Sequence, residues 1–240
     1  SCRGGSGAGC HLAKLLTMRI DLLSLYVMLV SNYSQEVPML QRKPAEDRKT
    51  DIVEALLRLA DQIGPDRLTT NDIAREVGVT QAAIFRHFPT KAELWTAVGD
   101  AIADRLEEAW QQAVNANETA ETRVRALIST QLRQIEKTPA LPAILHSREL
   151  NVDNATLRER FRRVLMQYQN HLVTNLEDMA DAGKMAATVH PKDAAVLLTS
   201  LVQGIAIRWN LGSRSFAILP EGMRLLEIQL ALFACKAGNR

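Results

Sequence analysis

Apolar residues recur at helical spacing along most of this chain. In the stretch 47–63 they follow one another at intervals of four, three and four positions, which places them on a single helical stripe. That stripe consists of Ile52, Leu56, Leu59 and Ile63. No proline interrupts residues 90–138, 143–190 or 192–219, and no stretch alternates apolar and polar residues over strand length. Because proline breaks helices and half-buried strands need that alternation, the pattern predicts an all-α fold.

Residues 69–94 have the spacing of a helix-turn-helix. Thr69 and Asp72 form a capping-box pattern that opens a short helix. Gly78 stands where the chain must turn, and Thr80 suits the N-cap of the next helix, residues 81–87. The packing of this motif needs a small residue, a glycine four positions later and an apolar residue six positions further on. Those residues are Ala74, Gly78 and Ile84. The alternative is a plain helical hairpin in a bundle.

The remaining pattern predicts a helical bundle. Its expected helices are about 91–114, 121–137, 153–182, 191–211 and from Pro220 onward, with a break at 138–142 and a short segment to Glu149. We therefore expect three parts: an N-terminal extension at residues 1–45, a helix-turn-helix domain at 46–95 and a helical domain at 96–240.

Composition limits the kinds of nucleic-acid contact that remain open. Hydrophobic residues make up 47% and charged residues 23% of the 240, as in a soluble globular protein. With 29 Lys and Arg against 27 Asp and Glu, the net charge of +2 excludes a uniformly basic binder. The window 77–92 nevertheless contains no acidic residue, while Arg86, His87 and Lys91 lie within it. Any DNA contact is therefore expected from this local patch.

The N-terminal 45 residues are expected to lie outside the fold. The Gly- and Ser-rich start reads as a sequence foreign to the domain, and we expect the natural start at Met18 or Met39. Residues 12–30 are apolar, but their longest uncharged run, 22–30, is half of the roughly 20 residues that a membrane span needs. We expect no membrane role, and at most a short helix at residues 19–30. Cys2, Cys10 and Cys235 form neither CxxC nor an even set, which fits a reducing cytoplasm.

Residues 48–95 resemble the N-terminal domain of the TetR/AcrR transcriptional regulators. The segment FRHFPTKAELW, residues 85–95, is the most specific part. The other matching segments are Thr70-Asn71-Asp72-Ile73-Ala74, Gly78-Val79-Thr80 and Ile84. The resemblance implies a two-fold dimer that places the helix at 81–87 in the major groove of a palindromic operator. It also implies a small-molecule effector bound in the helical domain, and a repressor that the effector releases.

The resemblance assigns a DNA-binding role to nine residues. They are Thr69, Thr70, Thr80, Gln81, Ala82, Phe85, Arg86, His87 and Lys91. Gln81 is expected to read a base, Ala82 to contact a thymine methyl group, and Lys91 to hold a phosphate. For Thr80 the alternative to DNA contact is helix capping alone, and for His87 the alternative is packing on the helix surface. Phe85 departs from the family, which usually has a tyrosine whose hydroxyl meets a phosphate.

The helical domain offers candidates for an effector pocket and a dimer interface. Large or polar residues expected to line a cavity are Trp110, Leu132, Ile144, His146, Tyr168 and Trp209, with ordinary core packing as the alternative for each. Without a charged cluster, the default effector is apolar or amphipathic. The expected homodimer contacts are Leu201, Gly204, Ile205, Leu226 and Leu230. Gly204 in mid-helix suggests a close helix–helix approach, within or between subunits.

Catalytic and metal-binding motifs do not stand out. The chain lacks a P-loop, a G-x-S-x-G motif and the Rossmann glycines, and its five histidines are scattered. We expect no cofactor, no metal and no enzymatic activity. The competing hypothesis is an all-α enzyme or protein-interaction bundle with a fortuitous helix-turn-helix, which would be a monomer or a dimer formed through residues 70–91.

Overall fold

The computed structural model describes residues 45–234 and folds this range into ten α-helices without a strand. The helices are α2 (Ala45–Ile63), α3 (Thr70–Val77), α4 (Gln81–His87), α5 (Lys91–Asn115), α6 (Ala120–Lys137), α7 (Leu141–His146), α8 (Arg148–Asp153), α9 (Ala155–Asp181), α10 (Pro191–Leu211) and α11 (Ile218–Phe233). The all-α prediction is confirmed for this range. The expected helix at 19–30, the possible starts at Met18 and Met39, and all three cysteines lie outside the described residues.

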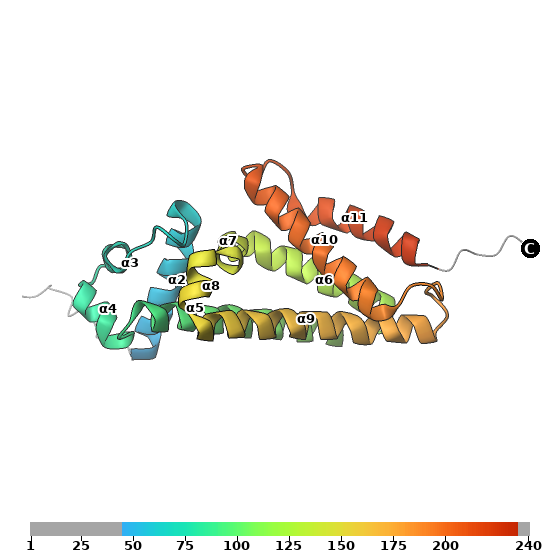
Figure 1. The fold of residues 1–240 in the computed structure, drawn as a ribbon, viewed down its shortest axis with the longest axis horizontal. Helices are drawn as coiled ribbons and strands as arrows, with labels where there is room; N and C mark the ends of the chain where they lie inside the picture. Colours follow the sequence, from blue (N-terminus) through green and yellow to red (C-terminus); the bar gives the residue numbers. More distant parts are fainter. Residues whose placement is uncertain (1–44, 235–240) are drawn as a thin grey trace, which may run out of the picture. The chain divides into compact units, whose positions relative to one another are not determined.

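Helices α2, α3 and α4 pack together at one end of α5 (Figure 1). Their shared core contains Ile52, Leu56 and Ile84, each without exposed surface, and the nearly buried Phe88. Ile63 was expected to face inward, but it is 41% exposed. It is the last residue of α2, and Gly64 turns the chain there with a φ of 85°.

The long helices α5, α6 and α9 pack on one another, and α10 and α11 cover α6 and α9 (Figure 1). Two glycines permit close contacts in this bundle: a Cβ on Gly99 would overlap Leu157, and one on Gly222 would overlap Leu132. Gly204 behaves differently, because it is exposed and a Cβ placed on it would meet no atom within 4 Å. The close approach expected at Gly204 therefore does not occur within the subunit.

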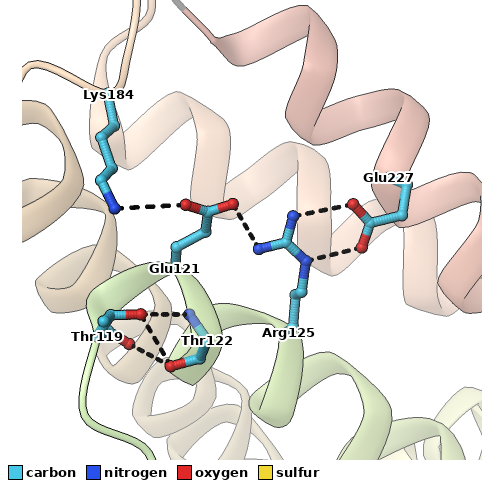
Figure 2. A network of polar contacts seen from close by, with 6 residues as sticks. All are labelled: Thr119, Glu121, Thr122, Arg125, Lys184 and Glu227. Atoms are coloured by element: carbon cyan, nitrogen blue, oxygen red, sulfur yellow. Dashed lines mark hydrogen bonds and ion pairs between the residues drawn. The ribbon is translucent and has the colours of Figure 1, made fainter.

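A polar network fixes α11 and the α9–α10 connection to the start of α6 (Figure 2). Arg125 on α6 donates to both carboxylate oxygens of Glu227 on α11, at 2.8 and 2.9 Å, and to Glu121 at 2.6 Å. Lys184 also reaches Glu121, at 3.5 Å. The Arg125 guanidinium holds the pKa of both carboxyl groups below the ordinary value, so the network carries paired charges near neutral pH.

Helix boundaries depart from the expected ones in two places. The break expected at 138–142 ends earlier, because α7 already starts at Leu141, and the short segment expected up to Glu149 forms two short helices, α7 and α8, which share Ser147 as C-cap and N-cap. The last helix starts at Ile218 rather than at Pro220. Most other ends lie within two residues of the expected ranges. The helix expected at 153–182, for example, is capped by Asn154 and ends at Asp181, and Gly183 follows with a φ of 68°.

Candidate functional site

The turn between α3 and α4 is built as its sequence predicts. Thr69 and Asp72 form a reciprocal capping box at the start of α3. Gly78 ends α3 in the left-handed region with a φ of 72°, where a side chain would be strained. The Thr80 hydroxyl then accepts the backbone N–H of Ala83 at 3.2 Å and starts α4. These caps fix the angle between the two helices and so the direction in which α4 presents its side chains.

The nine residues assigned to DNA contact share one accessible region. Seven of them are exposed: Thr69, Thr80, Gln81, Ala82, Phe85, Arg86 and Lys91. Thr70 and His87 are half-buried. The Gln81 amide donates to the Thr70 hydroxyl at 2.6 Å, so a residue of α3 positions the expected base-reading side chain of α4. This pairing was not expected from the sequence, because eleven positions separate the two residues.

The two acidic groups of α3, next to this surface, are engaged in ion pairs. Asp72 pairs with Arg75, and Glu76 pairs with Arg58 of α2 at 3.3 Å. Hydrogen bonds from Thr69 lower the pKa of Asp72, with Arg75 adding to the effect. No acidic residue lies on α4, and the first on α5 is Glu93, whose carboxylate accepts the Thr90 hydroxyl at 3.2 Å. The exposed face from α4 to Lys91 therefore carries the positive charges of Arg86 and Lys91. A phosphate backbone is the ligand that such a face attracts.

A cavity of about 410 Å³ lies between α5, α6, α7, α9 and α10. Three of the six expected pocket residues line it: Trp110, His146 and Tyr168. The other three lie elsewhere in the core. Leu132 packs against Gly222, Ile144 is fully buried away from the cavity, and the indole of Trp209 donates to the Phe216 carbonyl at 3.0 Å. A second hollow of about 590 Å³, between α2, α5 and α6, is lined largely by charged and amide side chains.

Polar contacts connect the helix-turn-helix to the bundle that holds the cavity. Arg214, in the α10–α11 connection, donates two hydrogen bonds to the carboxylate of Asp61 on α2, one of them at 3.0 Å. Asp66, in the loop before α3, accepts the hydroxyl of Ser147 at the end of α7. These pairs are 153 and 81 positions apart, and sequence spacing offers no signal for them.

Helices α10 and α11 expose an apolar face. On α10 the exposed residues recur at helical spacing opposite the buried stripe, and on α11 two large apolar residues are exposed as well. The face consists of Val196, Leu197, Ile207, Leu211, Ile228 and Leu232, with Gly204 among them. Of the expected interface residues, Leu201 is half-buried, whereas Ile205, Leu226 and Leu230 are buried in the subunit core.

A capped helix-turn-helix with an exposed basic face, joined to a helical bundle with a cavity, defines a class of ligand-binding transcription regulators. The profile described as "Bacterial regulatory proteins, tetR family" matches residues 52–98. The profile described as "MAATS-type transcriptional repressor, C-terminal region" matches residues 115–235, half of the chain. The chain therefore belongs to the tetR family and is a DNA-binding regulator of transcription.

Known proteins resemble the chain over most of its length. The nucleoid occlusion factor SlmA of Vibrio vulnificus is 26% identical over 159 residues, which are 66% of this chain and 81% of that protein. A putative transcriptional regulator from Saccharomonospora viridis, solved with choline, superposes with a TM-score of 0.71 at 17% identity and covers 80% of this chain and all of its own. FadR of Bacillus subtilis, solved with stearoyl-CoA, superposes with a TM-score of 0.66 at 16% identity, covering 76% of this chain and 97% of its own.

Proposed function

We propose that this protein is a dimeric, effector-released transcriptional repressor of the cytoplasm, with residues 46–95 reading DNA and residues 96–240 binding effector and partner. The observation that carries the proposal is the combination of the exposed basic face around α4 with the cavity between α5, α7 and α9. Gln81, held by Thr70, would read a base edge in the major groove, and Lys91 would hold a phosphate at the N-terminus of α5.

The exposed face of α10 and α11 is the proposed homodimer interface. Helix α10 is long and apolar enough to cross a membrane by length and composition alone, yet eight of its residues are buried within the subunit. A second subunit that covers the opposite stripe would account for its hydropathy without a membrane. The two-fold symmetry of such a dimer would place two copies of α4 on a palindromic operator.

Helix α7 offers the route from effector to DNA. Leu141, Pro142, Leu145 and His146 of this short helix line the cavity, and Ser147 at its end contacts Asp66 before α3. An effector that fits the cavity only when α7 is in one of its positions would favour that position. Through the contact of Ser147 with Asp66, it would also favour the matching position of α3 and α4. If the spacing of the two recognition helices in this conformer does not match the operator, operator affinity falls. The effector would then act by shifting the population of the dimer toward the conformer that binds DNA weakly.

Mobility-shift titration on the DNA upstream of the gene tests the proposal. We expect salt-sensitive, sequence-preferring binding by a dimer. Gln81→Ala should relax the sequence preference, whereas Lys91→Ala should weaken binding to all sequences alike. Lys137→Ala, an exposed lysine at the end of α6, is the matched control.

Two other functions give different results in the same experiment. A monomer without DNA affinity would support the competing hypothesis of an enzyme or interaction bundle. The similarity to SlmA raises nucleoid occlusion as a second candidate, but the match of the repressor profile to residues 115–235 favours transcriptional control. Binding at many chromosomal sites without an effect on neighbouring transcription would reverse that preference.

A further inference from the structure

The floor of the 410 Å³ cavity is apolar and closed to solvent. Leu106, Trp110, Ile135 and Val202 line it, and each is at most 4% exposed. The rings of Trp110 and Tyr168 lie 4.9 Å apart, centroid to centroid, and form one wall. A cavity of this size lies within the roughly 300–1,000 Å³ of small-molecule sites, and its floor suits an apolar body.

Polar groups in this floor have hydrogen-bonding capacity left. Tyr168 lines the cavity with a side chain that is 4% exposed, and its buried hydroxyl has no hydrogen-bond partner among the described residues. Gln131, which also lines the cavity, accepts the indole N–H of Trp110 at 2.9 Å through its carbonyl oxygen, so its amide nitrogen is not used in that bond. An unpaired buried hydroxyl is unfavourable, so the floor is complementary to a neutral acceptor on a ligand.

The rim of the cavity, in contrast to its apolar floor, carries basic side chains. The exposed side chains of His146, Arg158 and Arg162 line the opening, and no Asp or Glu is among the described residues that do so. Arg162 is paired with Glu159 at 2.8 and 2.9 Å and also contacts the Met166 sulfur at 2.8 Å, whereas Arg158 donates to the Asn151 carbonyl at 2.7 Å. With Arg163 also near Glu159, three arginines surround one carboxylate. The rim therefore favours an anion and disfavours a cation.

We propose that the effector is an amphipathic carboxylate, with its acid group at Arg158 and Arg162, its apolar body in the floor, and a neutral hydrogen-bond acceptor at Tyr168. The acid group belongs at the rim because the floor holds no cation, and an unpaired buried carboxylate is strongly unfavourable. The inference rests on the proposed function only in taking this cavity as the effector site.

Calorimetric titration of the full-length protein, without DNA, tests the charge preference with three ligands of equal chain length. These are decanoate, decan-1-ol and decylammonium. We expect decanoate to bind most tightly and decylammonium least. The double variant R158Q/R162Q should weaken decanoate binding by about tenfold, with decanol within about twofold. Arg163→Gln is the matched control, because Arg163 is as exposed as Arg162 and lies near the same Glu159, but does not line the cavity.

A second titration tests the proposed hydrogen bond from the Tyr168 hydroxyl to a neutral acceptor on the ligand. Tyr168→Phe keeps the ring and removes only the hydroxyl. It should weaken binding of 9-oxodecanoate by about fivefold, the effect of one hydrogen bond, and leave decanoate unchanged. Equal losses for both ligands would contradict the assignment of Tyr168.

The outcomes separate this inference from the proposed function. Preference for decylammonium, or a decanoate affinity that does not respond to R158Q/R162Q, would overturn the inference even if the protein binds its operator. Rim-dependent decanoate binding by a protein without DNA affinity would overturn the proposed function and leave the inference standing.

Discussion

Phe85 lies 38% exposed on α4, at the position where the family resemblance implies a tyrosine. The ring is thus already at the surface proposed to face DNA, and only the hydroxyl donor is missing. We expect Phe85→Tyr to tighten operator binding by about two- to tenfold, since one hydrogen bond contributes about 0.5–1.5 kcal/mol. Mobility-shift titration at fixed salt measures this, and an affinity that is unchanged or weaker would show that Phe85 does not face a phosphate.

Gly204 of α10 and Gly222 of α11 differ in the space around them. A methyl group on Gly222 would overlap the side chain of Leu132, so Gly222→Ala should lower the free energy of unfolding by about 1–3 kcal/mol. Gly204 has open space around it, and alanine favours a helix over glycine by about 1 kcal/mol. Gly204→Ala should therefore raise the free energy of unfolding of the subunit by up to about 1 kcal/mol and, separately, change dimer dissociation. Urea unfolding and sedimentation equilibrium distinguish the two, and equal destabilisation by both variants would contradict the assignment.

In the proposed mechanism, helix α7 couples the cavity to the DNA-reading helices through the hydrogen bond from Ser147 to Asp66. Asp66→Ala removes this contact and leaves the Ser147 hydroxyl free to cap α8 through Leu150. We expect operator and effector affinities measured separately to change little. The effector should lose much of its power to release DNA, a coupling that typically amounts to about 1–3 kcal/mol. Glu118→Ala, an exposed acid in the α5–α6 connection, is the control. Release that remains complete in Asp66→Ala would place the coupling elsewhere.

Most elements, and the face of the helix-turn-helix, were predictable because they depend on local chemistry. Thr69, Gly78, Thr80 and Asn154 each act on the backbone within a few residues, so their roles are visible in the sequence. The bundle interior was predictable only in part. Trp110, His146 and Tyr168 reach the cavity, whereas Leu132, Ile144 and Trp209, equally apolar or aromatic, do not. Helical periodicity identifies the inward stripe of each helix, but not which part of the core remains hollow.

Features that depend on two distant helices were not visible in the sequence. Arg158 and Arg162 look like ordinary solvated positions of α9 until α7 brings His146 to the same opening. Gly204 and Gly222 are alike in sequence context, and only the packing of α6 shows which of them contacts another helix. The predicted interface residues Ile205, Leu226 and Leu230 belong to the buried stripe, because both faces of these helices are apolar.

At the scale of the whole molecule, several carboxylates support the fold through paired arginines. Arg224, together with Arg208, lowers the pKa of Glu221 to about 2, and Arg162 and Arg125 lower the pKa of Glu159 and Glu227. A group whose pKa is lower in the folded state stabilises the protein above its ordinary pKa, and this is lost as pH falls through the folded value. The free energy of unfolding should therefore decline from about pH 5 toward pH 2. Urea unfolding across this range measures it, and Glu221→Gln should flatten the curve. A stability that rises on acidification would contradict the pairing.

The two-sided apolarity of α10 has a consequence for how the protein responds to its own abundance. If a second subunit covers the outer stripe, dissociation returns that stripe to water, and the energy of association becomes part of the energy of folding. Melting temperature should then rise with protein concentration, and scanning calorimetry over a hundredfold dilution series would reveal it. On dilution, the occupancy of the operator would fall more steeply than in proportion to protein concentration. Dissociation removes one of the two recognition helices from the operator and also lowers the stability of the remaining subunit.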